Sequence, residues 1–186
     1  MPDGSRKGAQ MISASLYMLV FRPLHILSAI AWGGSIFMLV LFLQPTAKAI
    51  GPAGAPFMRE LLGTRRLANA ILGIAGLTIV AGGFLYWHDM DAFGGFSNFT
   101  DSAFGGTLTF GAISAIIAFL IGLLATKPTI ERMLATGAEI AQAGDQPPPQ
   151  LLERLGALQR RGRRLAIANL TFVAIAAFSM STARYW

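Results

Sequence analysis

The stretch from Pro23 to Leu43 constrains the fold of this chain most strongly. Its twenty-one residues carry no formal charge, and nearly all are apolar or small. A helix rises ~1.5 Å per residue, so a run of this length matches the ~30 Å hydrocarbon core of a bilayer. The pattern predicts a membrane-spanning helix that begins at Pro23, a first-turn position where the missing proline N–H costs nothing.

The composition places the whole chain in the membrane class. Apolar residues make up 54% of the sequence and charged residues only 13%, against about 25% charged in soluble domains. The absence of cysteine excludes disulfides, thiolate metal sites and iron–sulfur clusters. The net charge of +6 comes from basic residues at the ends of apolar segments. These residues therefore predict membrane topology, with no nucleic-acid partner.

Three more apolar stretches are long enough to span a bilayer. They cover residues 67–87, 107–125 and 165–183, and Pro45 and Pro128 are predicted to end the first and third spans. Residues 1–10 are expected to be disordered, and 11–21 to form a retained interfacial helix or a kinked extension. The predicted organisation is an N-terminal tail and interfacial segment (1–22), a first transmembrane hairpin (23–88), an outer loop (89–106) and a second hairpin with a long cytoplasmic connector (107–186).

The distribution of charge predicts the orientation. The first and third connectors hold eleven of the fifteen Lys and Arg residues. The loop between the second and third spans instead carries Asp89, Asp91 and Asp101, and it contains no basic residue. Because short basic loops stay in the cytoplasm, we expect a multi-pass protein of the bacterial inner membrane with both termini on the periplasmic side.

The two halves of the chain share a series of landmarks in the same order. Pro-Thr pairs at Pro45 and Pro128 are followed by double-arginine motifs at 65–66 and 163–164, and each half finishes on Tyr-Trp. The repeat predicts two similar helical hairpins in the same membrane orientation. The expected fold is an all-α membrane protein, a four-transmembrane-helix bundle built from these two hairpins.

The two histidines are the main candidates for ligands of a metal or a haem. His25 lies in the first span and His88 at the end of the second, and counting residues from Gln44 and Arg66 places both near the outer surface at similar depth. Imidazoles on adjacent helices could ligate haem iron, or could bind copper together with the thioether of Met90. The alternative is that each histidine makes an ordinary hydrogen bond at a helix end.

Other polar and small residues suggest how the helices pack. His25, Ser28, Trp32 and Ser35 share one helix face. Beside Trp32, Gly33 and Gly34 could make room for a flat cofactor, although close helix packing is the favoured interpretation. Asn69 and Asn169 are predicted to form hydrogen bonds between helices. Small-residue seams are predicted along residues 69–87 and 111–125.

The run Leu24-His25-Ile26-Leu27-Ser28-Ala29-Ile30-Ala31-Trp32-Gly33-Gly34 resembles the first-helix signature of the copper-resistance D (CopD)-like membrane proteins. The hairpin-duplicated layout is also similar to integral membrane relatives of that group. The resemblance implies a small inner-membrane protein linked to copper or haem, with His25 as the matching position. The membrane protoporphyrinogen oxidase of the HemJ type is a looser likeness, because its arginine after the first helix and its third-helix pattern are absent here.

Three hypotheses about function follow. The first is an integral inner-membrane protein that handles copper or haem b at an outer-side histidine site, with His25, His88 and Trp32 around the cofactor and His25, His88 and Met90 as metal ligands. The second is a non-catalytic accessory or assembly subunit that packs in the lipid bilayer against a larger respiratory or photosynthetic complex, or against a second copy. The third is a haem-linked membrane oxidoreductase.

Overall fold

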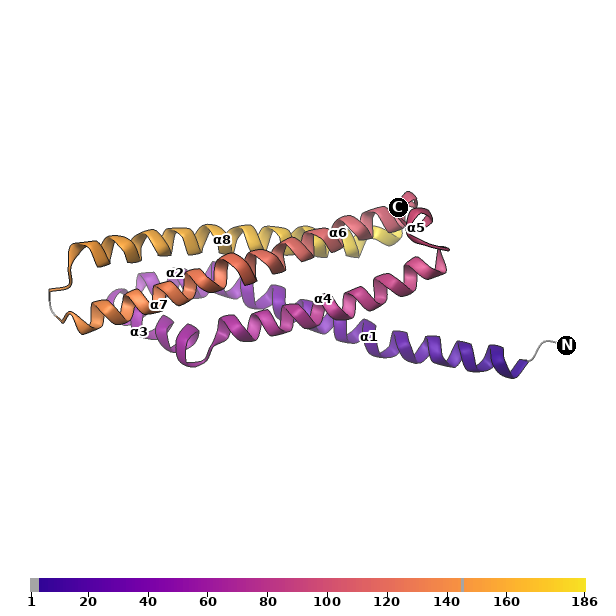
Figure 1. The fold of residues 1–186 in the computed structure, drawn as a ribbon, viewed down its shortest axis with the longest axis horizontal. Helices are drawn as coiled ribbons and strands as arrows, with labels where there is room; N and C mark the ends of the chain where they lie inside the picture. Colours follow the sequence, from indigo (N-terminus) through magenta and orange to yellow (C-terminus); the bar gives the residue numbers. More distant parts are fainter. Residues whose placement is uncertain (1–3, 145) are drawn as a thin grey trace.

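The computed structural model describes residues 4–144 and 146–186, and it describes side chains from Leu16 onward except at Pro52. Every regular element in these ranges is helical (Figure 1). In chain order they are α1 (Gly4–Met38), η1 (Leu39–Leu43), α2 (Gln44–Ala49), η2 (Gly51–Ala53), α3 (Gly54–Arg59), η3 (Glu60–Thr64), α4 (Leu67–Ala92), α5 (Phe96–Asp101), α6 (Ala103–Leu120), η4 (Ile121–Thr126), α7 (Lys127–Gln142), α8 (Pro149–Thr182) and η5 (Ala183–Tyr185).

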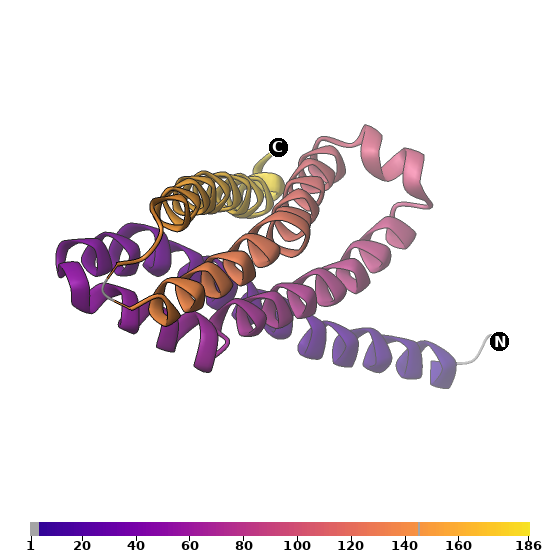
Figure 2. The ribbon, with the colours of Figure 1, turned by 60° about the vertical axis from the view of Figure 1, so that its left-hand side comes forward.

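Four helical segments among the described residues are long and apolar enough to cross a membrane. They cover Leu16–Ala49, Leu67–Ala92, Ala103–Gln142 and Pro149–Tyr185. The most extensive helix contacts are those of α1 with α4 and of α6 with α8, while smaller contacts join α4 to α6 and α1 to α8. Figures 1 and 2 show the resulting bundle, in which α6 lies between α8 and α4. The protein is therefore an all-helical, multi-pass membrane bundle.

The connectors gather at two ends of this bundle. The end formed by α2, α3, η3 and the turn between α7 and α8 holds the double-arginine motif Arg65-Arg66, and we call it the basic end. The opposite end, with α5 and the C-terminus, carries Asp89, Asp91 and Asp101, and we call it the acidic end (Figure 1). Helix α5 occupies part of the segment that the sequence predicted to be a loop.

The prediction that prolines end the first and third spans is wrong, and the reason is the same at both sites. Each proline follows a wider π-helical turn, η1 before Pro45 and η4 before Pro128. In these turns the Gln44 N–H donates to Leu39 O and the Lys127 N–H donates to Gly122 O, five residues back. The shifted register lets the helix continue past a residue that has no N–H and a bulky ring. The first and third membrane-spanning helices therefore continue into α2 and α7.

The first helix also begins earlier than the sequence predicted. It starts at Gly4 and continues through Pro23, which lies inside α1. Residues 1–3 of the predicted disordered tail lie outside the described residues, but the rest of that tail and the expected interfacial segment are helical. Proline is tolerated inside membrane helices because neighbouring groups satisfy the freed backbone carbonyl.

The two predicted small-residue seams have different outcomes. In α6, Gly111, Ala115 and Ala118 face the bundle, and a Cβ on Gly111 would lie 3.0 Å from Met180 Cγ of α8. In α4 most of the predicted stripe is exposed instead. There a Cβ on Gly73 or Gly83 would meet no described atom within 4 Å, and Val80, Trp87 and Asn69 are exposed, while a Cβ on the half-buried Gly76 would lie 4.0 Å from Phe119 Cε2 of α6. The buried face of α4 is offset and consists of Ile71, Ala75, Thr78 and Ala81.

The core lies at the centre of the bundle. Its largest buried residue is Trp32, which is 4% exposed and packs with Ile36 and Val40 of the first membrane-spanning segment. Alanines from the other three spans complete it: Ala75, Ala115, Ala118, Ala166 and Ala176. The polar face predicted for the first span therefore points inward, since Ser28 is buried beside Trp32.

Candidate functional site

The imidazole of His25 reaches from α1 to the backbone of α4. Its Nδ1 lies 2.9 Å from the carbonyl oxygen of Thr78. A carbonyl oxygen can only accept a hydrogen bond, so Nδ1 carries the proton and the lone pair of the neutral ring is on Nε2. Metal-ligating histidines are oriented in this way, with one nitrogen donating to a carbonyl and the other left for the metal.

Gly82 of α4 provides the space that the ring occupies. A Cβ built on Gly82 would lie 2.7 Å from His25 Cε1 and 2.9 Å from Nδ1, closer than real contacts allow. Only glycine at this position lets the imidazole approach the helix backbone. Its neighbour Gly83 has no described atom within 4 Å of such a Cβ, so the requirement is specific to Gly82.

His88 lies in a different environment, in an aromatic cluster near the acidic end. Its ring stacks on Tyr17 with centroids 5.3 Å apart, and its Nδ1 is 3.5 Å from Asp89 Oδ1. Tyr17 donates a hydrogen bond of 2.6 Å to Phe84 O, and Phe21 packs against the Phe84 ring. The cluster joins the outer turns of α1 and α4.

The two histidines do not share a level, which corrects the sequence prediction. His25 lies beside Thr78 and Gly82, whereas His88 lies beside Tyr17, eight residues earlier in α1. Eight residues of helix correspond to roughly 12 Å along the bundle. The prediction measured the two depths from Gln44 and Arg66, and Gln44 is not the end of the first helix, which continues from α1 through η1 into α2.

The described residues do not assemble a conventional metal cluster around these histidines. No group of three or more His, Cys, Asp or Glu residues within them could hold a metal ion. Met90, the predicted thioether ligand, lies two residues beyond His88 on α4 and is partly buried. His25 is therefore a single oriented imidazole, separated from His88 and Met90, the other two residues predicted to bind metal.

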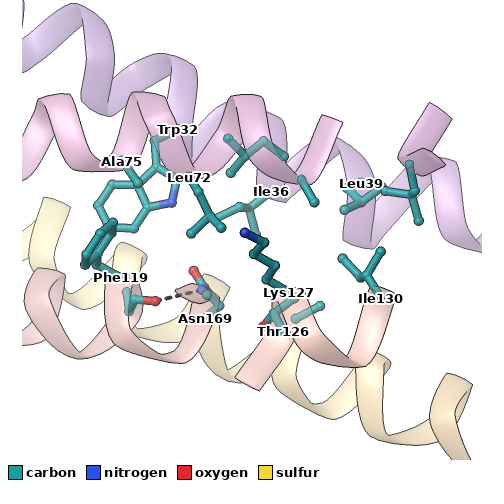
Figure 3. A pocket seen from close by; sticks show the side chains of 16 residues that line it. Trp32, Ile36, Leu39, Leu72, Ala75, Phe119, Thr126, Lys127, Ile130 and Asn169 are labelled. Carbon is teal, nitrogen blue, oxygen red and sulfur yellow. Dashed lines mark hydrogen bonds between the residues drawn. The ribbon is translucent and has the colours of Figure 1, made fainter. Parts of the chain in front are cut away.

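Trp32 lies away from both histidines, in the basic-end half of the core. It lines a cavity of about 60 Å³ between the α1–α4 pair and the α6–α8 pair. In Figure 3, Trp32 and Ile36 line one side of the cavity, and Phe119, Asn169 and Lys127 line the other. Gly33 packs against α8, where its Cβ would lie 3.2 Å from Val173 Cγ1, while Gly34 faces open space.

Asn169 makes the interhelical hydrogen bond predicted for it, whereas the side chain of Asn69 makes none to the described residues. The Nδ2 of Asn169 donates to Ala118 O at 2.8 Å, and the side chain is 5% exposed. Asn69 is exposed near the start of α4. The two asparagines follow equivalent double-arginine motifs, but the sequence carries no signal that separates the buried one from the exposed one.

Sequence reasoning missed Tyr17, Thr78 and Gly82, the residues that position the two histidines. Thr78 contributes a backbone oxygen, so its side chain gives no signal in the sequence. Gly82 is one of two adjacent glycines, and only the crossing of α1 and α4 distinguishes them. Comparisons with family models, curated proteins and solved structures found no match to this chain.

Proposed function

We propose that this protein is a membrane haem-binding protein in which His25 is the axial ligand. The observation that carries the proposal is the hydrogen bond from His25 Nδ1 to Thr78 O, which leaves the Nε2 lone pair available. Haem iron is the centre that this arrangement fits best, because a single protein nitrogen is enough to attach it.

Copper fits the described residues less well. A copper site needs two or more soft or imidazole ligands around one point. His88 and Met90 belong to the outer turns of α4, whereas His25 contacts α4 at Gly82. A copper site at His25 would therefore need ligands from a second copy or another chain, and haem remains the preferred centre.

The absorption spectrum of the purified protein tests the haem proposal. We expect a Soret band in protein expressed with haem supply, or after addition of hemin to the detergent-solubilised chain. The band should disappear in His25→Ala, because the only oriented imidazole is lost. His88→Ala is the matched control, and it should keep the band because His88 lies on a different level of the bundle.

Two results would reject the proposal. A folded protein that neither carries haem nor takes up hemin has no haem site. Equal loss of the band in both histidine variants would show that His25 has no special role. Binding of Cu(I) that depends on His25 in the absence of hemin binding would transfer the proposal from haem to copper.

We also propose the bacterial inner membrane as the location of the protein, with the basic end in the cytoplasm and both termini in the periplasm. The positive-inside rule supports this orientation, because the connectors of the basic end hold most of the Lys and Arg residues. The proposed duplication of two hairpins is supported by the π-helical turns η1 and η4, which precede Pro45 and Pro128 in the same order. Protease accessibility in spheroplasts tests the orientation.

A second candidate function is that of an accessory subunit in a larger membrane complex. The observation that favours it is the length of the third and fourth membrane-spanning segments. The third covers 40 residues and the fourth 37, or roughly 55–60 Å of helix against a ~30 Å hydrocarbon core. Their α7–α8 ends pack together and project beyond the bilayer, where a partner could dock. Co-purification with a large complex in mild detergent, lost on deletion of this projection, tests the subunit role.

A further inference from the structure

A hollow with mainly apolar walls and three charged residues, Arg66, Lys127 and Glu131, opens at the basic end of the bundle, next to the Trp32 cavity. Its volume is about 170 Å³, and it lies between η3, the start of α4 and the start of α7. The hollow and the cavity share Leu62, Ala68, Lys127 and Ile130 as lining residues, so they adjoin. Together they extend from the basic end toward the centre of the bundle.

The charge of the hollow favours an anion. Arg66 and Lys127 line it with Asn69, and the only lining carboxylate is Glu131, whose Oε1 lies 3.9 Å from Lys127 Nζ. The N-terminus of α4 also borders the hollow, and no side chain caps it. The free N–H groups of a helix N-terminus carry partial positive charge, which adds to that of the two basic side chains.

Two buried oxygen atoms belong to residues that line the adjoining cavity, and they have no hydrogen-bond partner among the described residues: Asn169 Oδ1 and Thr126 Oγ1. The Asn169 side chain is 5% exposed, and its Nδ2 is already committed to Ala118 O (Figure 3). A buried acceptor without a donor is costly, and a water molecule or a hydroxyl group in the cavity would supply the donor for Oδ1.

The cavity and the hollow differ in volume, so they can hold different groups. The cavity of about 60 Å³ has room for a few water molecules or a slender chain, but it is smaller than the ~150 Å³ that accommodates a benzene ring. The hollow of about 170 Å³ is wide enough for a tetrahedral oxyanion. An anion in the hollow, with a water molecule or a hydroxyl group in the cavity beside Asn169, fits the volumes of both spaces.

We propose that the hollow bordered by Arg66, Lys127 and the N-terminus of α4 binds a phosphate ester group. Phosphate oxygens accept from both basic side chains and from the α4 N–H groups, and hydroxyls or waters around the phosphate supply the donor for Asn169 Oδ1. An anionic phospholipid of the inner leaflet and a soluble phosphate ester carry the same chemistry. The apolar walls of the adjoining cavity suit the lipid source.

Lipid retention by the full chain tests the proposal. The detergent-purified protein is incubated with phosphatidylglycerol or with phosphatidylcholine of identical acyl chains, and bound lipid is counted by native mass spectrometry. We expect preferential retention of phosphatidylglycerol. The double variant Arg66→Gln/Lys127→Gln should lose this preference, by about fivefold in affinity for each basic group removed.

Matched variants separate this site from general surface charge. Arg160→Gln/Arg161→Gln removes two exposed basic residues of α8 that do not line the hollow, and it should keep the preference. Lys127→Arg keeps the charge and should keep the preference as well. Helicity measured by circular dichroism establishes that each variant is folded.

Each outcome decides the proposal. Loss in the Arg66/Lys127 variant alone supports it, and displacement of the lipid by inorganic phosphate would also support it while identifying a soluble ester as the natural source. Absence of any preference for phosphatidylglycerol over phosphatidylcholine, together with no binding of inorganic phosphate, overturns it. Equal loss in the α8 control overturns it too, because the effect is then one of overall charge.

Discussion

The contact between α1 and α4 and the contact between α6 and α8 solve the same packing problem with different chemistry. Hydrogen bonds from His25 to Thr78 O and from Tyr17 to Phe84 O link α1 to α4. The α6–α8 contact relies on small residues, with Gly111 against Ala176, Ser179 and Met180, and on one hydrogen bond from Asn169. In lipid, both methods can replace the hydrophobic effect that drives helix association in water.

The difference explains where a ligand could be held. Close packing of small residues makes the α6–α8 contact structural along most of its length, with Asn169 Oδ1, which has no partner among the described residues, as an exception. The α1–α4 contact positions an imidazole whose second nitrogen is uncommitted. Both histidines of the chain lie in its first half, so the α6–α8 contact has no counterpart to the His25 imidazole. The following substitutions test this comparison, from the largest expected effect to the smallest.

Gly111→Leu should disrupt the α6–α8 contact most strongly. Even a Cβ at this position would lie 3.0 Å from Met180 Cγ and 3.3 Å from the backbone oxygen of Ala176, which cannot rotate away. We expect a loss of about 3 kcal/mol in the free energy of unfolding, typical of severe overpacking. Equilibrium unfolding in detergent by circular dichroism measures it. An unfolding curve equal to that of the wild type would show that α6 and α8 do not pack at Gly111.

Gly82→Ala should disturb the α1–α4 contact through His25. The new methyl group would displace the imidazole and break its bond to Thr78 O, at a cost of about 2 kcal/mol for an unsatisfied donor. The gain of about 1 kcal/mol from replacing helical glycine by alanine offsets part of this, which leaves a net loss of about 1 kcal/mol. Unfolding in detergent measures the loss, and the His25 ring signals in NMR should shift.

Gly83→Ala is the control for this variant. It has the same helix-propensity gain and no described neighbour within 4 Å of its Cβ, so it should stabilise the protein slightly and leave the His25 signals unchanged. Identical behaviour of the two variants would contradict the proposed position of His25.

Asn169→Ala should weaken the α6–α8 contact moderately. It removes the bond to Ala118 O, and hydrogen bonds between membrane helices contribute about 0.6 kcal/mol on average. Asn69→Ala, at the corresponding exposed position, should change the free energy of unfolding by less than about 0.5 kcal/mol. A larger effect at Asn69 than at Asn169 would reverse the assignment of the buried asparagine.

Gly73→Ala, like Gly83→Ala, should cause no loss of stability. It lies on the outward face of α4, where a Cβ meets no described atom within 4 Å. We expect a slight stabilisation, no more than about 1 kcal/mol, because alanine is the better helix former. A clear destabilisation, measured by the same detergent unfolding, would indicate that the outward face of α4 contacts a second copy or another chain.

The sequence by itself determined the helical membrane class, the number of spans and the grouping of basic and acidic connectors. These properties follow from the length of the apolar runs and the position of charges, which are local features. The small-residue seam of α6 was also predictable, because its residues repeat at helical spacing. The same prediction of an interhelical hydrogen bond was made for Asn69 and Asn169, and only the structure shows that Asn169 is the one that makes it.

Only the tertiary structure decided which residues meet across the bundle. Continuation past Pro45 and Pro128 depends on the π-helical turns η1 and η4, which the apolar pattern does not encode. The register of α1 against α4 decides that His25 meets Thr78 and Gly82 while His88 meets Tyr17. The rotation of α4 turns Gly73 outward and leaves Asn69 exposed beside the hollow at the basic end. Register and rotation are properties of pairs of helices, so a single helical pattern cannot specify them.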